Sequence, residues 1–280
     1  MSRAQITKPI HRWNAGAIST ADDAISVEEP LEIRLGYYKE ASRERSNVSV
    51  TMRTPGNDEE LAAGFLFTEN LVKHPNDIEG FHRIDSGFRK SQIDNIIQVN
   101  LKAGIEVNMD LLSRHFYTTS SCGVCGKTSI DLVQSLVETR FLNPGLKVEA
   151  SLISTLPAKL RAAQAQFDST GAIHAAALFN PDGELLALRE DVGRHNALDK
   201  LVGHFFLKDG LPLDKSILLL SGRASFELVQ KASMAGIQVV AAVGAPSSLA
   251  IELADEANIT LIGFLREERM NIYTGAERIS

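Results

Sequence analysis

The chain has 280 residues, of which 44% are hydrophobic and 23% charged, with a net charge of −6 and a pI of about 5.7. This composition is typical of a globular protein that buries a core, and the length allows two domains. The acidic balance excludes a general nucleic-acid surface, which needs a concentrated basic face. The sequence contains no run of about 18 apolar residues, so no membrane span is predicted. The polar first residues lack the apolar stretch of a signal peptide, so a cytosolic location is the default expectation.

The first part of the chain predicts a lead-in followed by strands. Residues 1–28 have no clear period and are expected to be extended or disordered. Alternating apolar residues then predict two strands, each with one buried face. These alternating residues are Leu31, Ile33 and Leu35 in the first strand, and Val48, Val50 and Met52 in the second.

A helix over residues 61–71 is expected next, opened by a capping box in Asn57-Asp58-Glu59-Glu60 and ended by Pro75. Further strands are expected around residues 81–84 and 93–101, and a helix over 129–141. The break at Asn143-Pro144-Gly145 predicts a domain boundary. We therefore expect a lead-in over 1–28, an N-terminal α+β domain over 29–145 and an α/β domain over 146–280.

The second half is more regular. A helix over 156–167 would carry Pro157 in its first turn, and Asn180-Pro181-Asp182-Gly183 is typical of the turn of a hairpin. Helices over 196–206, 225–235 and 248–257 then alternate with strands over 217–220, 238–243 and 261–265. The strands are apolar at successive positions, which predicts a sheet with parallel crossovers and helices on both faces.

The only two cysteines lie in the loop Cys122-Gly123-Val124-Cys125. Glycines give this loop conformational freedom, and a predicted helix begins directly after it. A helix N-terminus and the nearby Lys127 both favour the thiolate, which is the reactive form. In a cytosolic protein such a pair is more often reactive or metal-bound than a structural disulfide. The loop therefore predicts sulfur chemistry.

Zinc binding and disulfide exchange are the competing interpretations of the cysteine pair. A tetrahedral zinc site needs four ligands, and two thiols supply half of them. There is no second C-x-x-C and no H-x₃-H motif, so zinc ranks below reactive sulfur and no tightly bound metal is expected. A thioredoxin-like motif would follow the first strand of a βαβ unit, whereas residues 110–117 are not a clear strand. Redox exchange stays open.

Four corners that follow predicted strands are polar or contain glycine: residues 190–196, 221–225, 244–248 and 263–269. Three of them contain arginine, whose planar fork suits phosphate. Ligands of open α/β sheets bind beyond the carboxyl ends of the strands, near helix N-termini. A single corner would be an ordinary loop with surface salt bridges, but four on one edge favour a nucleotide or phosphate site.

Two histidines lie near these corners. His174 is on a predicted buried strand, where a hydrogen-bonded core residue is the usual interpretation, although its small neighbours would leave room for a ligand. His195 lies at a helix start beside Arg194 and Asp191, where it would orient a ligand or tune a thiol.

Several motifs together resemble the formate dehydrogenase accessory sulfurtransferase family, known as FdhD, from about residue 28 to the end. They are the cysteine loop up to Gly126, Thr-Gly-Ala-Ile-His-Ala-Ala-Ala from Thr170, Glu-Asp-Val-Gly-Arg-His-Asn-Ala-Leu-Asp-Lys from Glu190, Ser-Gly-Arg-Ala-Ser from Ser221, Gly263-Phe264 with Ile272-Tyr273-Thr274, and Glu-Leu-Ala-Ala-Gly-Phe from Glu60 with Glu69.

The resemblance implies a sulfurtransferase. Members of the family take sulfur as a persulfide from a cysteine desulfurase and pass it to the molybdenum bis(guanine dinucleotide) cofactor before that cofactor enters formate dehydrogenase. Cys122 would then carry the persulfide and Cys125 would assist or relay it. The family also suggests a homodimer.

The cofactor is, by this resemblance, a bound acceptor substrate. The stretch that matches the family's cofactor-binding segment is Phe264, Leu265, Arg266, Glu267, Glu268 and Arg269. Its glutamates stand where lysine or glycine would suit phosphate better, which leaves Arg266 and Arg269 as the anchors. The other polar corners add Arg194, His195, Ser221 and Arg223 as candidate contacts.

The C-terminal half of the family is similar to the cytidine deaminase fold, a mixed sheet flanked by helices, and the predicted element order fits it. Zinc deaminases open one helix with H-x-E and a later one with P-C-x-x-C. The equivalent corners here, 193–196 and 221–224, hold neither the cysteines nor that glutamate, so deaminase chemistry is not carried over. A thiol–disulfide oxidoreductase and a non-enzymatic cofactor chaperone stay open as alternative functions.

Overall fold

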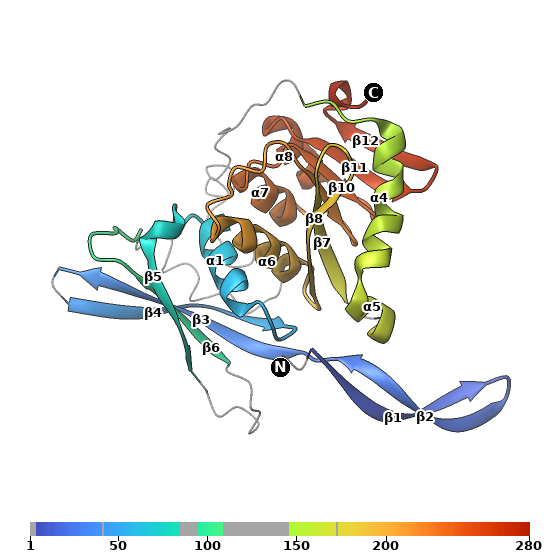
Figure 1. The fold of residues 1–280 in the computed structure, drawn as a ribbon, viewed down its shortest axis with the longest axis horizontal. Helices are drawn as coiled ribbons and strands as arrows, with labels where there is room; N and C mark the ends of the chain where they lie inside the picture. Colours follow the sequence, from blue (N-terminus) through green and yellow to red (C-terminus); the bar gives the residue numbers. More distant parts are fainter. Residues whose placement is uncertain (1–3, 41, 85–94, 109–145, 172) are drawn as a thin grey trace.

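The computed structural model describes residues 4–40, 42–84, 95–108, 146–171 and 173–280 (Figure 1). The described residues form a two-stranded sheet, a four-stranded sheet with the order β4-β3-β6-β5, and a six-stranded sheet with the order β12-β11-β10-β9-β7-β8. The predicted fold class, an α+β first part and a mixed sheet flanked by helices, is confirmed. The predicted boundary at 143–145 lies outside the described residues.

The six-stranded sheet is built from the second half of the chain. Its centre consists of the parallel strands β9 (Ile217–Leu220), β10 (Val239–Ala242) and β11 (Thr260–Arg266). The antiparallel strand β7 (His174–Phe179) joins β9 to the edge strand β8 (Leu185–Asp191), and β12 (Arg269–Thr274) forms the other edge. The predicted hairpin turn is confirmed, because Asn180 Oδ1 accepts hydrogen bonds from the amides of Asp182 (3.1 Å) and Glu184 (2.8 Å).

Helices cover both faces of this sheet, as predicted (Figure 1). One face packs against α6 (Arg194–Phe206), α7 (Phe226–Met234) and α8 (Ser248–Glu256), and the other against α4 (Ala150–Ala163), which α5 (Ala165–Thr170) follows. Successive strand residues alternate between the two cores: Leu218 lies with α6 and α7, and Leu219 lies with α4. This two-sided burial explains why the strands are apolar at every position.

Helix α4 begins six residues earlier than the predicted helix, so Pro157 lies inside it and not in its first turn. Proline in a helix removes one backbone hydrogen bond and is costly. The helix persists because Ile153, Leu156 and Leu160 are almost fully buried against the sheet, at 0%, 0% and 2% exposure. Tertiary packing therefore overrides the local preference.

The four-stranded sheet belongs to the first half. It consists of β3 (Glu29–Lys39), β4 (Ser42–Arg53), β5 (Ile78–Ile84) and β6 (Ile96–Leu101), with α1 (Asp58–Thr68) packed on one face and a short 3₁₀ turn η1 (Pro75–Asp77) before β5. Leu31, Ile33 and Leu35 are buried as predicted.

The predicted buried face of the second strand is only partly correct. Val48 is buried, whereas Val50 and Met52 are 62% and 43% exposed. The register between β3 and β4 shifts here: Ile33 is opposite Ser49, but Arg34 is opposite Asn47. The extra residue is Val48, and a bulge of this kind reverses which side chains face the core.

The predicted capping box at the start of α1 is wrong. Asn57 is in the left-handed conformation (φ 56°), and its side chain makes no capping hydrogen bond. Asp58 instead accepts two hydrogen bonds from the buried guanidinium of Arg53, at 2.9 and 3.2 Å. The helix ends at Thr68, and Pro75 opens η1 rather than ending the helix.

Within the expected extended or disordered lead-in, β1 (Gln5–Asn14) and β2 (Ala17–Ser26) pair as an antiparallel hairpin that projects away from the body (Figure 1). Its base contacts α5 through a 2.8 Å hydrogen bond from Ser26 to Thr170. No helix within the described ranges is both long and apolar enough to cross a membrane.

The two halves meet where α1 crosses α6. An ideal Cβ on Gly64 of α1 would lie 1.9 Å from the carbonyl oxygen of Asp199, and one on Gly203 of α6 would lie 1.8 Å from that of Glu60. These distances exclude any side chain, so the crossing brings backbone against backbone. Beside it, the rings of Phe67 and Phe206 stack with centroids 5.0 Å apart.

We expect Gly64→Ala to destabilise the protein by at least about 2 kcal/mol, although alanine normally favours a helix, because the added methyl group forces the two helices apart. Thermal unfolding would show this as a fall in Tm of about 4–8 °C. Gly80→Ala in β5 is the control, since its Cβ would meet no atom within 4 Å. Equal Tm values for the two variants would contradict the close crossing.

Candidate functional site

The predicted sulfur site at Cys122 and Cys125 lies outside the described residues, as does Lys127. In the part of the chain that the structure describes, no three histidine, cysteine, aspartate or glutamate side chains come together as a metal site. Because both thiols fall outside that part, this result does not bear on zinc at the cysteine loop.

The four polar corners meet at one edge of the six-stranded sheet, as predicted from their positions after strands. Strands β8, β9, β10 and β11 all end there, and the antiparallel β7 begins there at His174. We call this edge the carboxyl edge; it comprises His174 and residues 190–196, 221–225, 244–248 and 263–269. Backbone hydrogen bonds join neighbouring corners, from Gly244 N to Gly222 O (2.9 Å) and from Phe264 N to Gly244 O (3.0 Å).

Small residues let these corners approach closely. An ideal Cβ on Gly244 would lie 3.1 Å from Cα of Arg223, and one on Gly263 would lie 2.7 Å from Cδ of Pro246. The loops therefore form a continuous backbone surface, and Arg223 stands out from it with an exposed side chain.

The arginines of the carboxyl edge differ in what they contact. Arg194, the first residue of α6, has a buried Nε for which the described part of the chain supplies no hydrogen-bond acceptor. Arg223 has no acidic partner among the described residues. Arg266, by contrast, donates from Nη1 to the carbonyl oxygens of Val243 (2.8 Å) and Leu265 (2.9 Å). Two cationic side chains thus remain available for an anion.

His195 contacts Ser225 Oγ at 3.3 Å and Glu227 Oε2 at 3.7 Å, both through Nε2. A catalytic triad uses both ring nitrogens, one for the nucleophile and one for the acid, so this trio is not a hydrolase triad. Burial opposes ionisation of Glu227, but hydrogen bonds from His195, its own amide and Ser225 outweigh burial and lower its pKa to about 2. Glu227 therefore remains an anion that holds His195.

The predicted cofactor stretch divides into exposed and buried positions. Phe264 has a positive φ of 51° and is 40% exposed, whereas Leu265 is fully buried in the α4-side core. The β11–β12 hairpin exposes Arg266, Glu267, Glu268 and Arg269. Leu265 is therefore a core residue in this structure, and any ligand contact in the stretch falls to its neighbours. Positive φ is uncommon in non-glycine residues and occurs often at functional sites.

Ser221, another predicted contact, makes hydrogen bonds within the sheet. Its Oγ accepts a 2.8 Å hydrogen bond from the amide of Ala175, and its own amide donates to the carbonyl oxygen of Ala175 (3.0 Å). The hydroxyl keeps a proton to donate outward.

The stretch from Glu190 to Lys200, which we call the Glu190 block, has a second role that the sequence did not reveal. Asp191, fully buried, accepts a hydrogen bond from the amide of Thr54 (3.1 Å) and pairs with Lys200 Nζ (2.7 Å), while Asn196 Nδ2 donates to the carbonyl oxygen of Met52 (2.8 Å). Thr54 and Met52 belong to the first half. Much of this block therefore joins the two halves and does not face a ligand. No periodic signal marks such contacts.

A second buried network lies at the same junction. Asp199 and Lys231 pair at 2.9 Å, and Thr68 donates to Asp199 at 2.9 Å. Burial raises the pKa of Asp199 more than Lys231 lowers it; burial would lower the pKa of Lys231, but Asp199 and Glu69 raise it. The 2.9 Å geometry favours the ion pair, with both groups charged and hydrogen-bonded.

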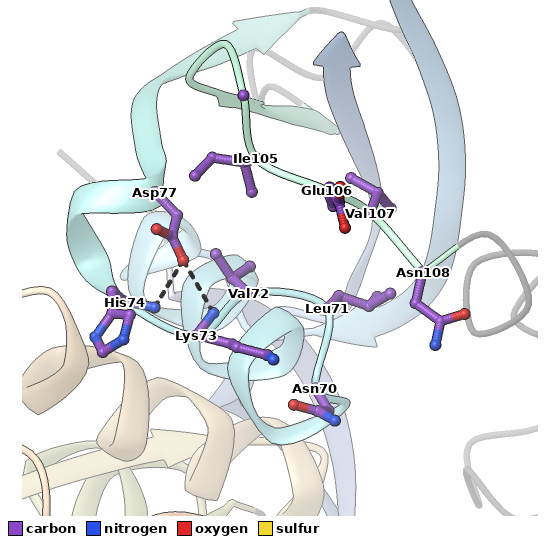
Figure 2. A pocket seen from close by; sticks show the side chains of 11 residues that line it. Asn70, Leu71, Val72, Lys73, His74, Asp77, Ile105, Glu106, Val107 and Asn108 are labelled. Atoms are coloured by element: carbon purple, nitrogen blue, oxygen red, sulfur yellow. Dashed lines mark hydrogen bonds between the residues drawn. The ribbon is translucent and has the colours of Figure 1, made fainter. Parts of the chain in front are cut away.

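A separate pocket of about 570 Å³ lies in the first half, between residues 70–77 and 104–108 (Figure 2). Its lining includes the apolar Leu71, Val72 and Ile105. Asp77 accepts hydrogen bonds from the amides of His74 (2.8 Å) and Lys73 (3.2 Å), so it fixes the loop. Among the described residues, none of the predicted site residues lines this pocket.

These features define an α/β protein whose mixed sheet presents, at its carboxyl edge, basic side chains that have no acidic partner among the described residues, and whose first half is anchored to this sheet through α6. The family model described as FdhD/NarQ matches residues 26–280, and the chain belongs to this family. The predicted resemblance is confirmed. The match leaves out nearly all of the β1–β2 hairpin.

Relatives named sulfur carrier protein FdhD align over the whole chain. The one from Streptomyces coelicolor is 47% identical over 282 residues, covering 100% of this chain and 97% of its own. The one from Mycobacterium tuberculosis is 46% identical over 286 residues, covering 100% of both. A candidate formate dehydrogenase accessory protein from Desulfotalea psychrophila has the same fold, with a TM-score of 0.75 at 23% identity, over 99% of this chain and 100% of that one.

The low pKa of Glu227 predicts an acid-dependent contribution to stability. A carboxyl whose folded pKa is about 2 stabilises the fold above its unfolded value near 4.5, and this contribution is lost as the pH falls through that window. Between pH 6 and pH 3 we expect the wild type to lose about 1–2 kcal/mol more than Glu227→Gln in urea unfolding. Glu252→Gln, at an exposed site on α8, should behave as the wild type. Parallel curves for wild type and Glu227→Gln would refute the contribution.

Proposed function

We propose that this protein carries a sulfur atom as a persulfide on Cys122, from a cysteine desulfurase to the molybdenum bis(guanine dinucleotide) cofactor that formate dehydrogenase needs. The observation that carries the proposal is membership of the FdhD/NarQ family together with a chain that holds a single C-x-x-C pair. The relatives' name, sulfur carrier protein, supports the same role. We further infer that it acts in the cytosol as a homodimer.

The loading step is a thiolate displacement. The Cys122 thiolate attacks the terminal sulfur of the donor's persulfide, R–S–SH; the S–S bond breaks, the donor leaves as R–S⁻, and Cys122–S–SH forms with the proton still on the terminal sulfur. A thiol pKa near ambient pH is best, because a lower value raises the thiolate fraction but reduces its nucleophilicity. Lys127 and the following helix start would supply that tuning.

Cys125 would release the carried sulfur. Its thiolate attacks Sγ of Cys122, a Cys122–Cys125 disulfide forms, and the terminal sulfur leaves as HS⁻ for the molybdenum centre. The protein is oxidised by two electrons in this step, so a dithiol reductant must restore the pair before the next cycle.

The carboxyl edge is where we place the guanine nucleotide part of the acceptor. Arg194 and Arg223 have no acidic partner in the described chain and suit phosphate, and Arg266 and Arg269 lie on the adjoining hairpin. His195, Ser221 and the exposed Phe264 add hydrogen-bonding and stacking groups. Glu267 and Glu268 are exposed at the hairpin turn, at the rim of this surface.

We expect Cys122→Ala, mixed with a cysteine desulfurase and free cysteine, to gain no sulfur, because no thiolate remains to attack the donor. Intact-protein mass spectrometry measures the added mass. Cys125→Ala is the matched control and should load like the wild type but deliver less sulfur. Sulfur loading on Cys122→Ala would refute the assignment, and full delivery by Cys125→Ala would refute the relay. Turnover in an insulin-reduction assay without desulfurase would favour the oxidoreductase instead.

GDP at about 100 times its Kd should stabilise the protein by about 2.7 kcal/mol, since it binds only the folded state. Differential scanning fluorimetry should therefore show a clear rise in Tm. Arg223→Met should reduce that rise, whereas Arg83→Met, at an exposed site on β5, should not. Absence of any shift at saturating GDP would overturn the nucleotide site while leaving the sulfur assay unaffected.

A further inference from the structure

His174 lies at the carboxyl edge, yet the sequence assigned it no firm role. It begins β7, where its backbone is opposite Asp191 of β8, and its imidazole is half-buried. No hydrogen bond joins either ring nitrogen to any described residue. A half-buried imidazole with no hydrogen-bond partner among the described residues keeps its donor and acceptor positions for a ligand at this edge.

Gly222 lies beside this ring. An ideal Cβ at Gly222 would lie 3.3 Å from Nδ1 and 3.4 Å from Cε1 of His174. Those contacts are tight but not impossible, and the backbone there does not need glycine for its own conformation. A side chain at position 222 would simply cover Nδ1. Glycine therefore leaves Nδ1 free of any side chain from position 222, and we call the place where that side chain would lie the Gly222 opening.

The charged groups that face His174 are Arg194 and His195 from α6 and Asp191 from β8. Asp191 is already paired with Lys200 at 2.7 Å, and His195 is held by Glu227. Arg194 has no acidic partner among the described residues, and its Nε is buried. Of the charged and titratable groups that face His174, one guanidinium is thus left beside the imidazole, a combination that suits an anionic oxygen.

We propose that His174 and Arg194, reached through the Gly222 opening, form a subsite for a phosphate group of the bound nucleotide. The proposal rests on the proposed function in one respect, that the carboxyl edge binds a guanine nucleotide. It goes further by naming His174 as a contact and by assigning this corner to phosphate rather than to the base.

The subsite has a pH signature. Burial first, and then Arg194 and His195, lower the pKa of His174, with Asp191 opposing them. The ring is therefore neutral in the empty protein near pH 7. A phosphate beside it favours the imidazolium, so binding takes up a proton and affinity rises as the pH falls. A residue with a purely structural role would not produce this dependence.

The test is calorimetric titration of GDP and of inorganic pyrophosphate into the wild type, His174→Gln, Gly222→Ala and the control His82→Gln, whose site on β5 is exposed. At pH 6, His174→Gln and Gly222→Ala should each weaken both ligands by about tenfold, and His82→Gln should not. From pH 8 to pH 6 the wild type should gain about fivefold more affinity than His174→Gln, a comparison that cancels titration of the ligand.

The outcomes separate the two proposals. If GDP binds the wild type and both variants equally at every pH, the His174 subsite is overturned and the nucleotide edge stands. If GDP binds the wild type but inorganic pyrophosphate does not, the phosphate assignment is overturned. If the wild type binds neither ligand, the subsite and the nucleotide site are both overturned. Sulfur loading on Cys122 is tested separately, by intact-protein mass spectrometry.

Discussion

The backbone contact between α1 and α6 at Gly64 and Gly203 is the constraint on which the rest of the structure depends. Helix α1 also packs on the four-stranded sheet, and α6 packs on the six-stranded sheet, so the two cores share one pair of helices. Overpacked cores lose stability as neighbours move apart. A change at the crossing would therefore shift one sheet against the other and carry the carboxyl edge with it.

Helix α6 connects this junction to the site. Its first turn contributes Arg194 and His195 to the carboxyl edge, while Asn196, Asp199 and Lys200 bind the first half of the chain. Neighbouring residues on one helix cannot move independently, so the orientation of Arg194 is fixed by the contacts that join the halves. Residues that look like a single motif thus divide between the proposed binding site and the contacts that position it.

The sequence predicted the second half well because its signals are local and repeated. Apolar strands, alternating helices and the Asn180 turn each depend on a few neighbouring residues, and the strand order then places four corners on one edge. The predictions that proved wrong concern residues whose partners are distant in sequence, or a strand whose register changes. Three features have no periodic signal in the sequence. They are the bulge at Val48, the hydrogen bonds of Asp58 with Arg53, and the burial that keeps Pro157 inside α4. The sequence places His174 on its strand, but that its ring has no hydrogen-bond partner among the described residues is visible only in three dimensions.

An anion site in a protein of net charge −6 needs its nearby carboxylates neutralised. The structure meets this condition for two carboxylates near the carboxyl edge, since Asp191 is buried against Lys200 and Glu227 holds His195, whereas Glu267 and Glu268 are exposed at its rim. Because charges that are paired at short range contribute little field farther away, Arg194 and Arg223, which have no acidic partner among the described residues, add positive potential at the proposed anion site. Net charge thus describes the surface as a whole, and the local field depends on which charges remain without a partner.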